Sequence, residues 1–73
     1  MAIIDVKAEI SGSVWKIEAK VGDSLAEDDA VAILESMKME IPVSAPEDGK
    51  VVEILVSEGD TVADGDIIAR IEV

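Results

Sequence analysis

Apolar and polar residues alternate along several short stretches of the chain, as they do in strands with one buried face. The alternation is clearest over residues 14–19 and recurs over residues 52–56. Residues 67–73, IIARIEV, are rich in β-branched side chains, which favour strands. Gly-Asp pairs at 22–23 and 59–60 are turn signals between these stretches. The pattern predicts short strands joined by tight turns, with Trp15 in the core opposite Val52.

The two halves of the chain resemble each other. When Gly12 is placed over Gly49, a shift of 37 positions, the two halves align without a gap. The identical pairs include Ile4/Ile41, Val6/Val43, Ala8/Ala45, Val14/Val51, Ile17/Ile54, Gly22/Gly59, Asp23/Asp60, Ala26/Ala63, Asp29/Asp66, Ala32/Ala69 and Glu35/Glu72. Two copies are too few for a solenoid. We therefore predict one all-β domain over 1–73, a flattened β-barrel or sandwich of two pseudo-symmetric halves, about 1–37 and 38–73.

One segment favours a helix on local grounds. Residues 24–40, SLAEDDAVAILESMKME, are full of helix formers, and Ser24 with Glu27 resembles a capping box. The matching segment of the second half, TVADGDIIARIE, reads clearly as strand. Because matching halves should fold alike, we predict strands over 30–36 and 39–45, with a hairpin between them.

The tip of this predicted hairpin has unusual residues. Met37 and Lys38 stand at the junction of the halves, where both turn residues of a two-residue hairpin need positive φ. Asn-Gly or Asp-Gly would suit that geometry, whereas Met-Lys does not. A local rule that fails in an otherwise consistent sequence points to function. We expect Lys38 to be exposed and within reach of another enzyme, with the chain termini at the opposite end of the domain.

Composition excludes most catalytic chemistry. The chain has 73 residues, 49% of them hydrophobic, and contains no Cys and no His. These absences exclude disulfides, Cys or Ser nucleophiles activated by His, and the usual zinc sites. The acidic turns at 27–29 and 64–66 do not have EF-hand spacing, so we predict no metal site and no catalytic residue.

The charge balance limits the possible partners. A net charge of −11 argues against nucleic acid and against an anionic membrane surface. The first residues, MAIIDVKAEI, do not form a signal peptide, and the longest apolar run, AVAIL, is too short for a membrane span. We expect a cytoplasmic protein.

The hairpin sequence resembles a known modification motif. Glu35-Ser36-Met37-Lys38-Met39 is similar to the Glu-Ala-Met-Lys-Met attachment motif of biotinyl domains, including biotin carboxyl carrier domains. The resemblance runs from about Val6 to Val73 and is closest to the small free-standing biotin/lipoyl attachment proteins. Ser36 replaces the usual Ala, Asp28 stands opposite Gly65, and the protruding loop of some bacterial carrier proteins is missing.

The resemblance implies a carrier and not an enzyme. Lys38 would be biotinylated by a biotin protein ligase, and the arm would carry carboxyl groups from a biotin carboxylase to a carboxyltransferase. Met37 and Met39 would flank the ring, or else only fill space in the hairpin. Glu35 and Ser36 belong to the motif. Glu35 recurs as Glu72 in the half that has no lysine at its tip. Two roles are therefore equally open for Glu35: contact with the ligase, or a structural role on the surface of the strand.

Two other functions remain open. Lipoyl domains share the fold but usually have Asp-Lys-Ala at the tip, which this chain lacks. The following residues, Glu40-Ile41-Pro42, nevertheless also suit lipoyl relatives. A carrier of lipoate, or of either group, loaded by a lipoyl ligase, is therefore the first alternative. An unmodified acidic interaction module is the second.

Overall fold

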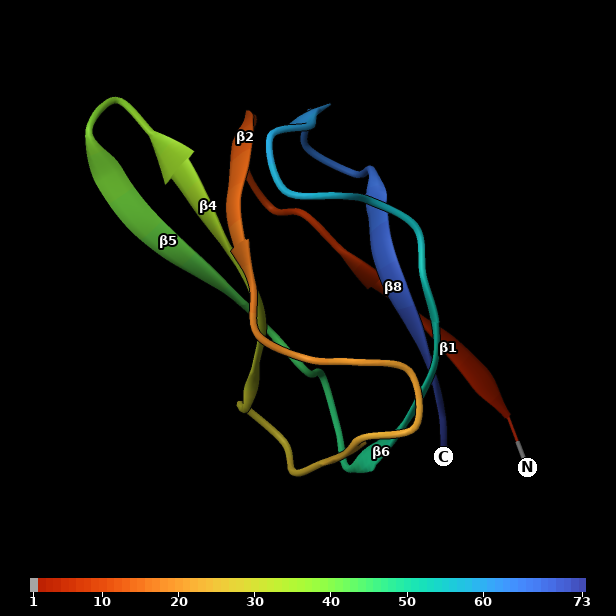
Figure 1. The fold of residues 1–73 in the computed structure, drawn as a ribbon. Helices are drawn as coiled ribbons and strands as arrows, with labels where there is room; N and C mark the ends of the chain where they lie inside the picture. Colours follow the sequence, from red (N-terminus) through yellow and green to blue (C-terminus); the bar gives the residue numbers. More distant parts are fainter. Residues whose placement is uncertain (1) are drawn as a thin grey trace.

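A computed structural model of the chain describes residues 2–73 and consists of short antiparallel strands (Figure 1). The eight strands are β1 (Ile3–Lys7), β2 (Gly12–Ile17), β3 (Ser24–Leu25), β4 (Ala30–Ser36), β5 (Met39–Ser44), β6 (Gly49–Ile54), β7 (Thr61–Val62) and β8 (Ile67–Glu72). They form two four-stranded sheets, one in the order β1-β8-β6-β3 and the other in the order β5-β4-β2-β7. The predicted all-β sandwich is confirmed.

The strands of the two halves correspond. Shifted by 37 positions, β1–β4 fall on β5–β8 with their ends within one residue. Each sheet contains strands from both halves, because β1 pairs with β8 in one sheet and β2 pairs with β7 in the other. Neither half therefore forms a sheet by itself.

The segment with helical propensity is a strand. β4 pairs with β2 on one side and with β5 on the other, and it places Val31, Ala32 and Leu34 in the core. Burial of these side chains and two ladders of hydrogen bonds outweigh a propensity difference of a few tenths of a kcal/mol per residue. The choice of strand over helix, made from the repeat, is confirmed.

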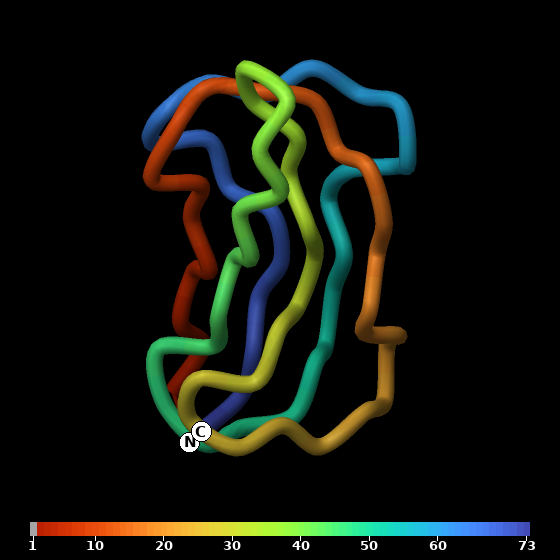
Figure 2. Tube along the Cα trace, turned by 90° about the vertical axis from the view of Figure 1, so that its left-hand side faces the viewer, coloured from red at the N-terminus to blue at the C-terminus, as the bar shows by residue number. Residues whose placement is uncertain are grey.

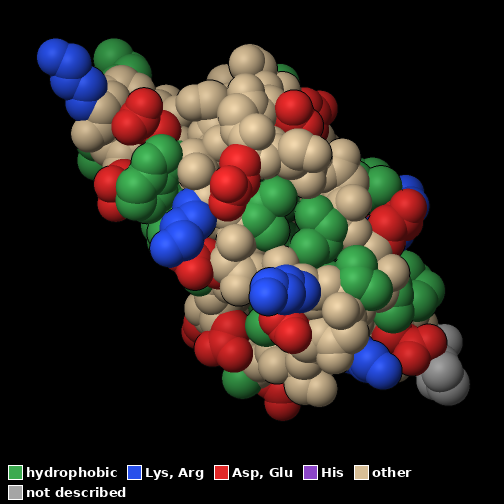
Figure 3. All heavy atoms as spheres, viewed as in Figure 1, with side chains coloured by type: hydrophobic (Ala, Val, Ile, Leu, Met, Phe, Trp, Pro, Cys, Tyr) green, Lys and Arg blue, Asp and Glu red, His purple; other side chains and the backbone are tan. Residues whose placement is uncertain are grey.

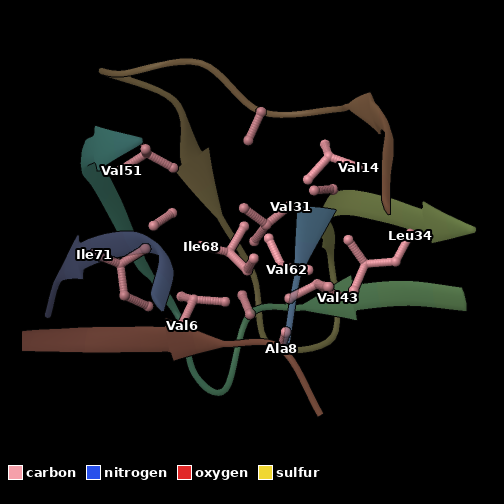
Figure 4. Packing of buried hydrophobic residues seen from close by; sticks show 14 residues of the cluster. Val6, Ala8, Val14, Val31, Leu34, Val43, Val51, Val62, Ile68 and Ile71 are labelled. Atoms are coloured by element: carbon pink, nitrogen blue, oxygen red, sulfur yellow. The ribbon is translucent and has the colours of Figure 1, made fainter. Parts of the chain in front are cut away.

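One core lies between the two sheets. Figure 4 shows Val14, Val31, Leu34 and Val43 pointing toward Val6, Val51, Ile68 and Ile71 of the other sheet. The remaining buried hydrophobic residues are Ala8, Ala19, Ala32, Ala45, Val62 and Ala69. Apart from Leu34, the interior consists of small and β-branched side chains, and no buried polar or charged residue occurs within residues 2–73.

Trp15 is not in the core, and the prediction that placed it there is wrong. The β2–β4 register shifts between Val14 and Lys16, so Trp15 occupies a bulge and its side chain is 49% exposed. The equivalent residue Val52 lies at a matching shift in β6 and is 38% exposed. A bulge inserts one residue and reverses the inward and outward positions that follow it. The buried residues at these sites are Val14 and Val51.

The acidic turns have a structural role. Four Asp side chains each accept a hydrogen bond from a backbone N–H three residues earlier: Asp23 from Lys20, Asp29 from Ala26, Asp60 from Ser57 and Asp66 from Ala63. Side-chain acceptors of this kind stabilise tight turns. No group of acidic side chains in residues 2–73 is arranged to hold a metal ion.

The domain is elongated, with principal extents of 36, 17 and 17 Å. The β4–β5 turn lies at one end and both termini lie at the other (Figure 2). At the terminal end, the amides of Ala2 and Val73 donate hydrogen bonds to each other's carbonyl groups at 3.2 and 2.9 Å. In the stretch from Ala2 to Val73, no helix is long and apolar enough to cross a membrane.

Candidate functional site

The β4–β5 hairpin presents the candidate lysine. Its ladder ends with Ser36 opposite Met39, so Met37 and Lys38 form a two-residue loop. Their φ angles are +50° and +67°, both in the left-handed region. This is the geometry of a type I′ turn, formed here by two residues that do not favour it. The hairpin tip lies where the repeat predicted it.

The stem of the hairpin imposes this conformation on the tip. Leu34 and Val43 are buried on the inner face of the stem, and Leu34 pairs with Ile41 in the ladder. A slip of one residue would turn every inward side chain outward, so the register is fixed. The left-handed conformation costs an ordinary residue roughly 1–2 kcal/mol. The packed stem therefore holds the tip in a strained conformation.

The side chains at the tip are exposed. Met37 is 92% exposed and Met39 is 64% exposed, while Lys38 between them is also exposed. In the space-filling view a basic side chain projects from the corner formed by the β4–β5 turn, with apolar atoms beside it (Figure 3). Two methionines this exposed do not fill the hairpin interior, so space-filling does not account for them. They form an apolar rim around a free amine.

Acidic residues flank the base of the tip. Glu35 and Glu40 pair across the β4–β5 ladder, and both are exposed. Like charges placed directly opposite each other are unfavourable in a sheet. The ion pairs of residues 2–73 join Lys16 to Glu18 and Arg70 to Asp5 and Glu53, so Lys38 takes part in none of them. The amine is therefore available to an incoming group.

Ser36 closes the hairpin and is half-buried, opposite Met39. A small side chain fits this position because β2, the neighbour of β4 in the sheet, passes close to it. An added Cβ at Gly12 would lie 2.6 Å from the backbone oxygen of Glu35 and 3.4 Å from the Cβ of Ser36. Gly12 thus supports the tip by letting β2 approach the end of β4. In the sequence, Gly12 stood out only as the residue equivalent to Gly49 in the repeat, and its contact with Glu35 was not predicted.

The best-defined charge network lies on the other sheet. The Arg70 guanidinium on β8 donates hydrogen bonds to Glu53 on β6 at 2.8 Å and to Asp5 on β1 at 3.0 Å. These two hydrogen bonds raise the pKa of Arg70 above its usual value, and the bond to Glu53 has the larger effect. This triad links three strands of the sheet opposite the hairpin and contributes nothing to the tip.

Comparison with known proteins identifies the family. The family model described as "Biotin-requiring enzyme" matches residues 4–71. The biotin/lipoyl attachment protein of Bacillus subtilis is 44% identical over 66 residues, covering 90% of both chains. The biotinylated protein TB7.3 homolog of Mycobacterium leprae is 48% identical over 67 residues, covering 92% of this chain and 94% of the relative.

A solved structure agrees with these matches. The urea carboxylase of Kluyveromyces lactis superposes with a TM-score of 0.93 at 40% identity, covering 99% of this chain and 6% of the carboxylase. The chain belongs to the biotin/lipoyl attachment family. The predicted membership, biotin as the cofactor and the role of biotin carrier are confirmed at the level of the family.

Proposed function

We propose that this chain is a biotin carrier protein in which the Nζ of Lys38 is the attachment atom. The observation that carries the proposal is an exposed lysine between two exposed methionines, held by the fold on a positive-φ turn. A structural surface lysine needs neither the strained turn nor the apolar rim. The chain offers the amine and the ligase supplies the catalysis.

Attachment is an acyl transfer to the lysine. The neutral amine of Lys38 attacks the carbonyl carbon of the biotinyl adenylate, an amide C–N bond forms, and AMP departs with the electron pair of the broken C–O bond. An ordinary lysine is protonated in neutral water, so the ligase must accept a proton from it. Lys38 loses its positive charge, which leaves Glu35 and Glu40 as the charged groups near the tip.

The carrier role follows from tethering. When bound, biotin supplies the ring nitrogen that accepts and releases a carboxyl group. The hairpin tip presents the biotinylated Lys38 side chain to a biotin carboxylase and then to a carboxyltransferase. The sandwich holds this side chain at one end of the domain. Tethering replaces a dilute solute by a high local concentration at each site. The chain itself catalyses neither step, and its place of action is the cytoplasm.

Lipoate is the second candidate group. A 44% identical relative is named as a biotin/lipoyl attachment protein, and Glu40-Ile41-Pro42 suits lipoyl relatives as well. A lipoyl ligase would act on the same Lys38 amine. The two methionines beside Lys38 favour biotin as the first candidate.

Transfer of a carboxyl group tests the proposed function. The biotinylated chain is incubated with a biotin carboxylase, MgATP and radiolabelled bicarbonate, beside Lys38→Ala and a Lys50→Ala control on β6. We expect label on the native chain and on Lys50→Ala, and none on Lys38→Ala. A chain that carries biotin on Lys38 but gains no label would contradict the carrier role.

A further inference from the structure

A groove opens beside the attachment hairpin, where the edge strands of the two sheets meet. It has a volume of about 130 Å³ and lies between the end of β1 and β5. Its lining residues are Lys7, Glu9, Ile10, Leu34, Ile41, Pro42, Val43 and Ser44. We call it the edge groove and propose that it is a resting site for the ring of the biotinyl group on Lys38. This inference rests on the proposed function.

The groove has the size and the walls for a small ring system. The groove, at about 130 Å³, is slightly smaller than the cavity of about 150 Å³ that encloses benzene, so it would take one edge of the bicycle and leave the rest open to water. Ile10 and Ile41 are half-buried, and Pro42 is exposed beside them. These three residues provide an apolar wall for the hydrocarbon and thioether part of the ring.

The rim of the groove suits the polar part of the ring. A ureido group has one carbonyl oxygen that accepts hydrogen bonds and two N–H groups that donate them. Lys7 and Ser44 bring donors to the rim, and Glu9 brings a carboxylate acceptor. No ion pair within residues 2–73 occupies Lys7. Apolar walls with a few polar groups are the usual composition of small-molecule sites.

The arm is long enough to reach the groove. Ile41 and Pro42 follow Lys38 by three and four residues along β5, about 10–14 Å at 3.4 Å per residue. The lysine side chain and the acyl chain together contain about ten bonds, which span roughly 12 Å when extended. The ring can therefore fold back along β5.

The symmetry of the chain shows that the apolar wall is specific to the end of the domain that carries the attachment hairpin. Under the 37-residue shift, Ile10 corresponds to Glu47 and Pro42 corresponds to Asp5. The equivalent position at the terminal end of the domain therefore has charged residues at two wall positions, Asp5 in the first half and Glu47 in the second, although the strands there have the same arrangement. A purely structural requirement would apply to both halves. The apolar residues near Lys38 are therefore better explained by a ligand that is present only at that end, such as the group attached to Lys38.

Methyl NMR of the biotinylated full chain tests this proposal. The chain is labelled at isoleucine methyl groups, and attachment is first verified by intact mass. We expect nuclear Overhauser contacts between ring protons and the methyl groups of Ile10 and Ile41. Their resonances should also shift relative to the unmodified chain. Ile4 is the matched control, because it corresponds to Ile41 in the other half, and its resonance should not move.

The variant Ile10→Glu completes the test. It introduces the residue that the symmetric position already carries, so the fold should tolerate it, and an unchanged Ile4 resonance verifies this. We expect the ring contacts and the Ile41 shift to disappear while biotin remains attached. Attached biotin without ring contacts to Ile10 or Ile41 in the native chain would overturn the groove proposal alone. No biotin increment in the mass would overturn the carrier function and, with it, the groove proposal.

Discussion

At the scale of single residues, Met37 and Lys38 combine unfavourable backbone conformations with exposed side chains. Both have positive φ, and neither side chain gains burial that would offset the cost. Stability alone would select Asn-Gly at these positions. The residues are therefore explained by what they present to other molecules, and their replacement should separate stability from function.

Met37→Asn should stabilise the domain and impair modification. Asn tolerates the left-handed region, so we expect the free energy of unfolding to rise by about 0.5–1 kcal/mol, part of the usual left-handed penalty. The rate of biotinylation should fall because an apolar contact for the ligase is lost. Urea denaturation and intact mass over time measure the two effects. Met39→Asn is the matched control, since Met39 lies in β5, where Asn is unfavourable. Equal stability changes in both variants would contradict the strained-turn account.

The residues beside Lys38 should also set the choice of cofactor. Replacing Met37 by Asp and Met39 by Ala gives the tip the Asp-Lys-Ala sequence, and we expect acceptance to move from biotin toward lipoate. Intact mass after competition between the two ligases measures the ratio of products. An unchanged ratio would show that the residues flanking Lys38 do not discriminate between the ligases.

At the scale of elements, the hairpin depends on β2, the strand beside it in the sheet. Gly12 on β2 and Gly49 on β6 are equivalent, and an added Cβ would lie 2.6 Å from Glu35 O in one case and 2.9 Å from Glu72 O in the other. The two contacts are alike, but only the first lies at the end of β4 that carries the attachment tip. Comparing the two glycines therefore distinguishes an effect on the stability of the fold from an effect on the attachment site.

Gly12→Ala and Gly49→Ala should both destabilise the domain. We expect each to cost about 1–3 kcal/mol, because the backbone must move to relieve the overlap. Only Gly12→Ala should also slow biotinylation of the folded protein, since it displaces the end of β4. Thermal unfolding and ligation below the unfolding range measure these effects. Equal ligation rates in the two variants would show that Gly12 does not position the tip.

The elements also show how far sequence reasoning extends. The repeat correctly favoured strand over helix for β4 and located the two-residue turn at Met37-Lys38. It did not reveal the bulges that expose Trp15, because a bulge depends on the ladder with β4 and leaves no mark in an alternating pattern. The contact of Gly12 with Glu35 was hidden for the same reason, since it exists only once the strands are paired. The edge groove was not predictable either, because it is formed by residues that are far apart in the sequence, at the end of β1 and in β5.

At the scale of the whole molecule, the two halves share one core and unfold together in our account. Leu34 and Ile71 are equivalent under the repeat, and both are completely buried. Because each sheet contains strands from both halves, loss of either side chain weakens the same core.

Leu34→Ala and Ile71→Ala should therefore have similar effects. We expect each to lower the free energy of unfolding by about 2–5 kcal/mol, with a single cooperative transition. Denaturation followed by Trp15 fluorescence and by circular dichroism measures this. Transitions that differ between the two probes would indicate halves that unfold independently.

The arrangement of the whole domain suits a carrier. The attachment tip and the two termini lie at opposite ends of a body 36 Å long (Figure 2). A partner enzyme can therefore bind the tip without contacting the terminal end. The same architecture accounts for similarity to a small part of a large carboxylase as well as to relatives of this chain's own length.

The measurement that tests the central claim most directly is the intact mass of the chain after separate co-expression with a biotin ligase and with a lipoyl ligase. Lys38→Ala serves as the control. Our account predicts one biotin increment on the native chain and none on Lys38→Ala. A lipoyl increment alone would move the function to a lipoyl carrier. No increment with either ligase would contradict the carrier account and leave the unmodified acidic module.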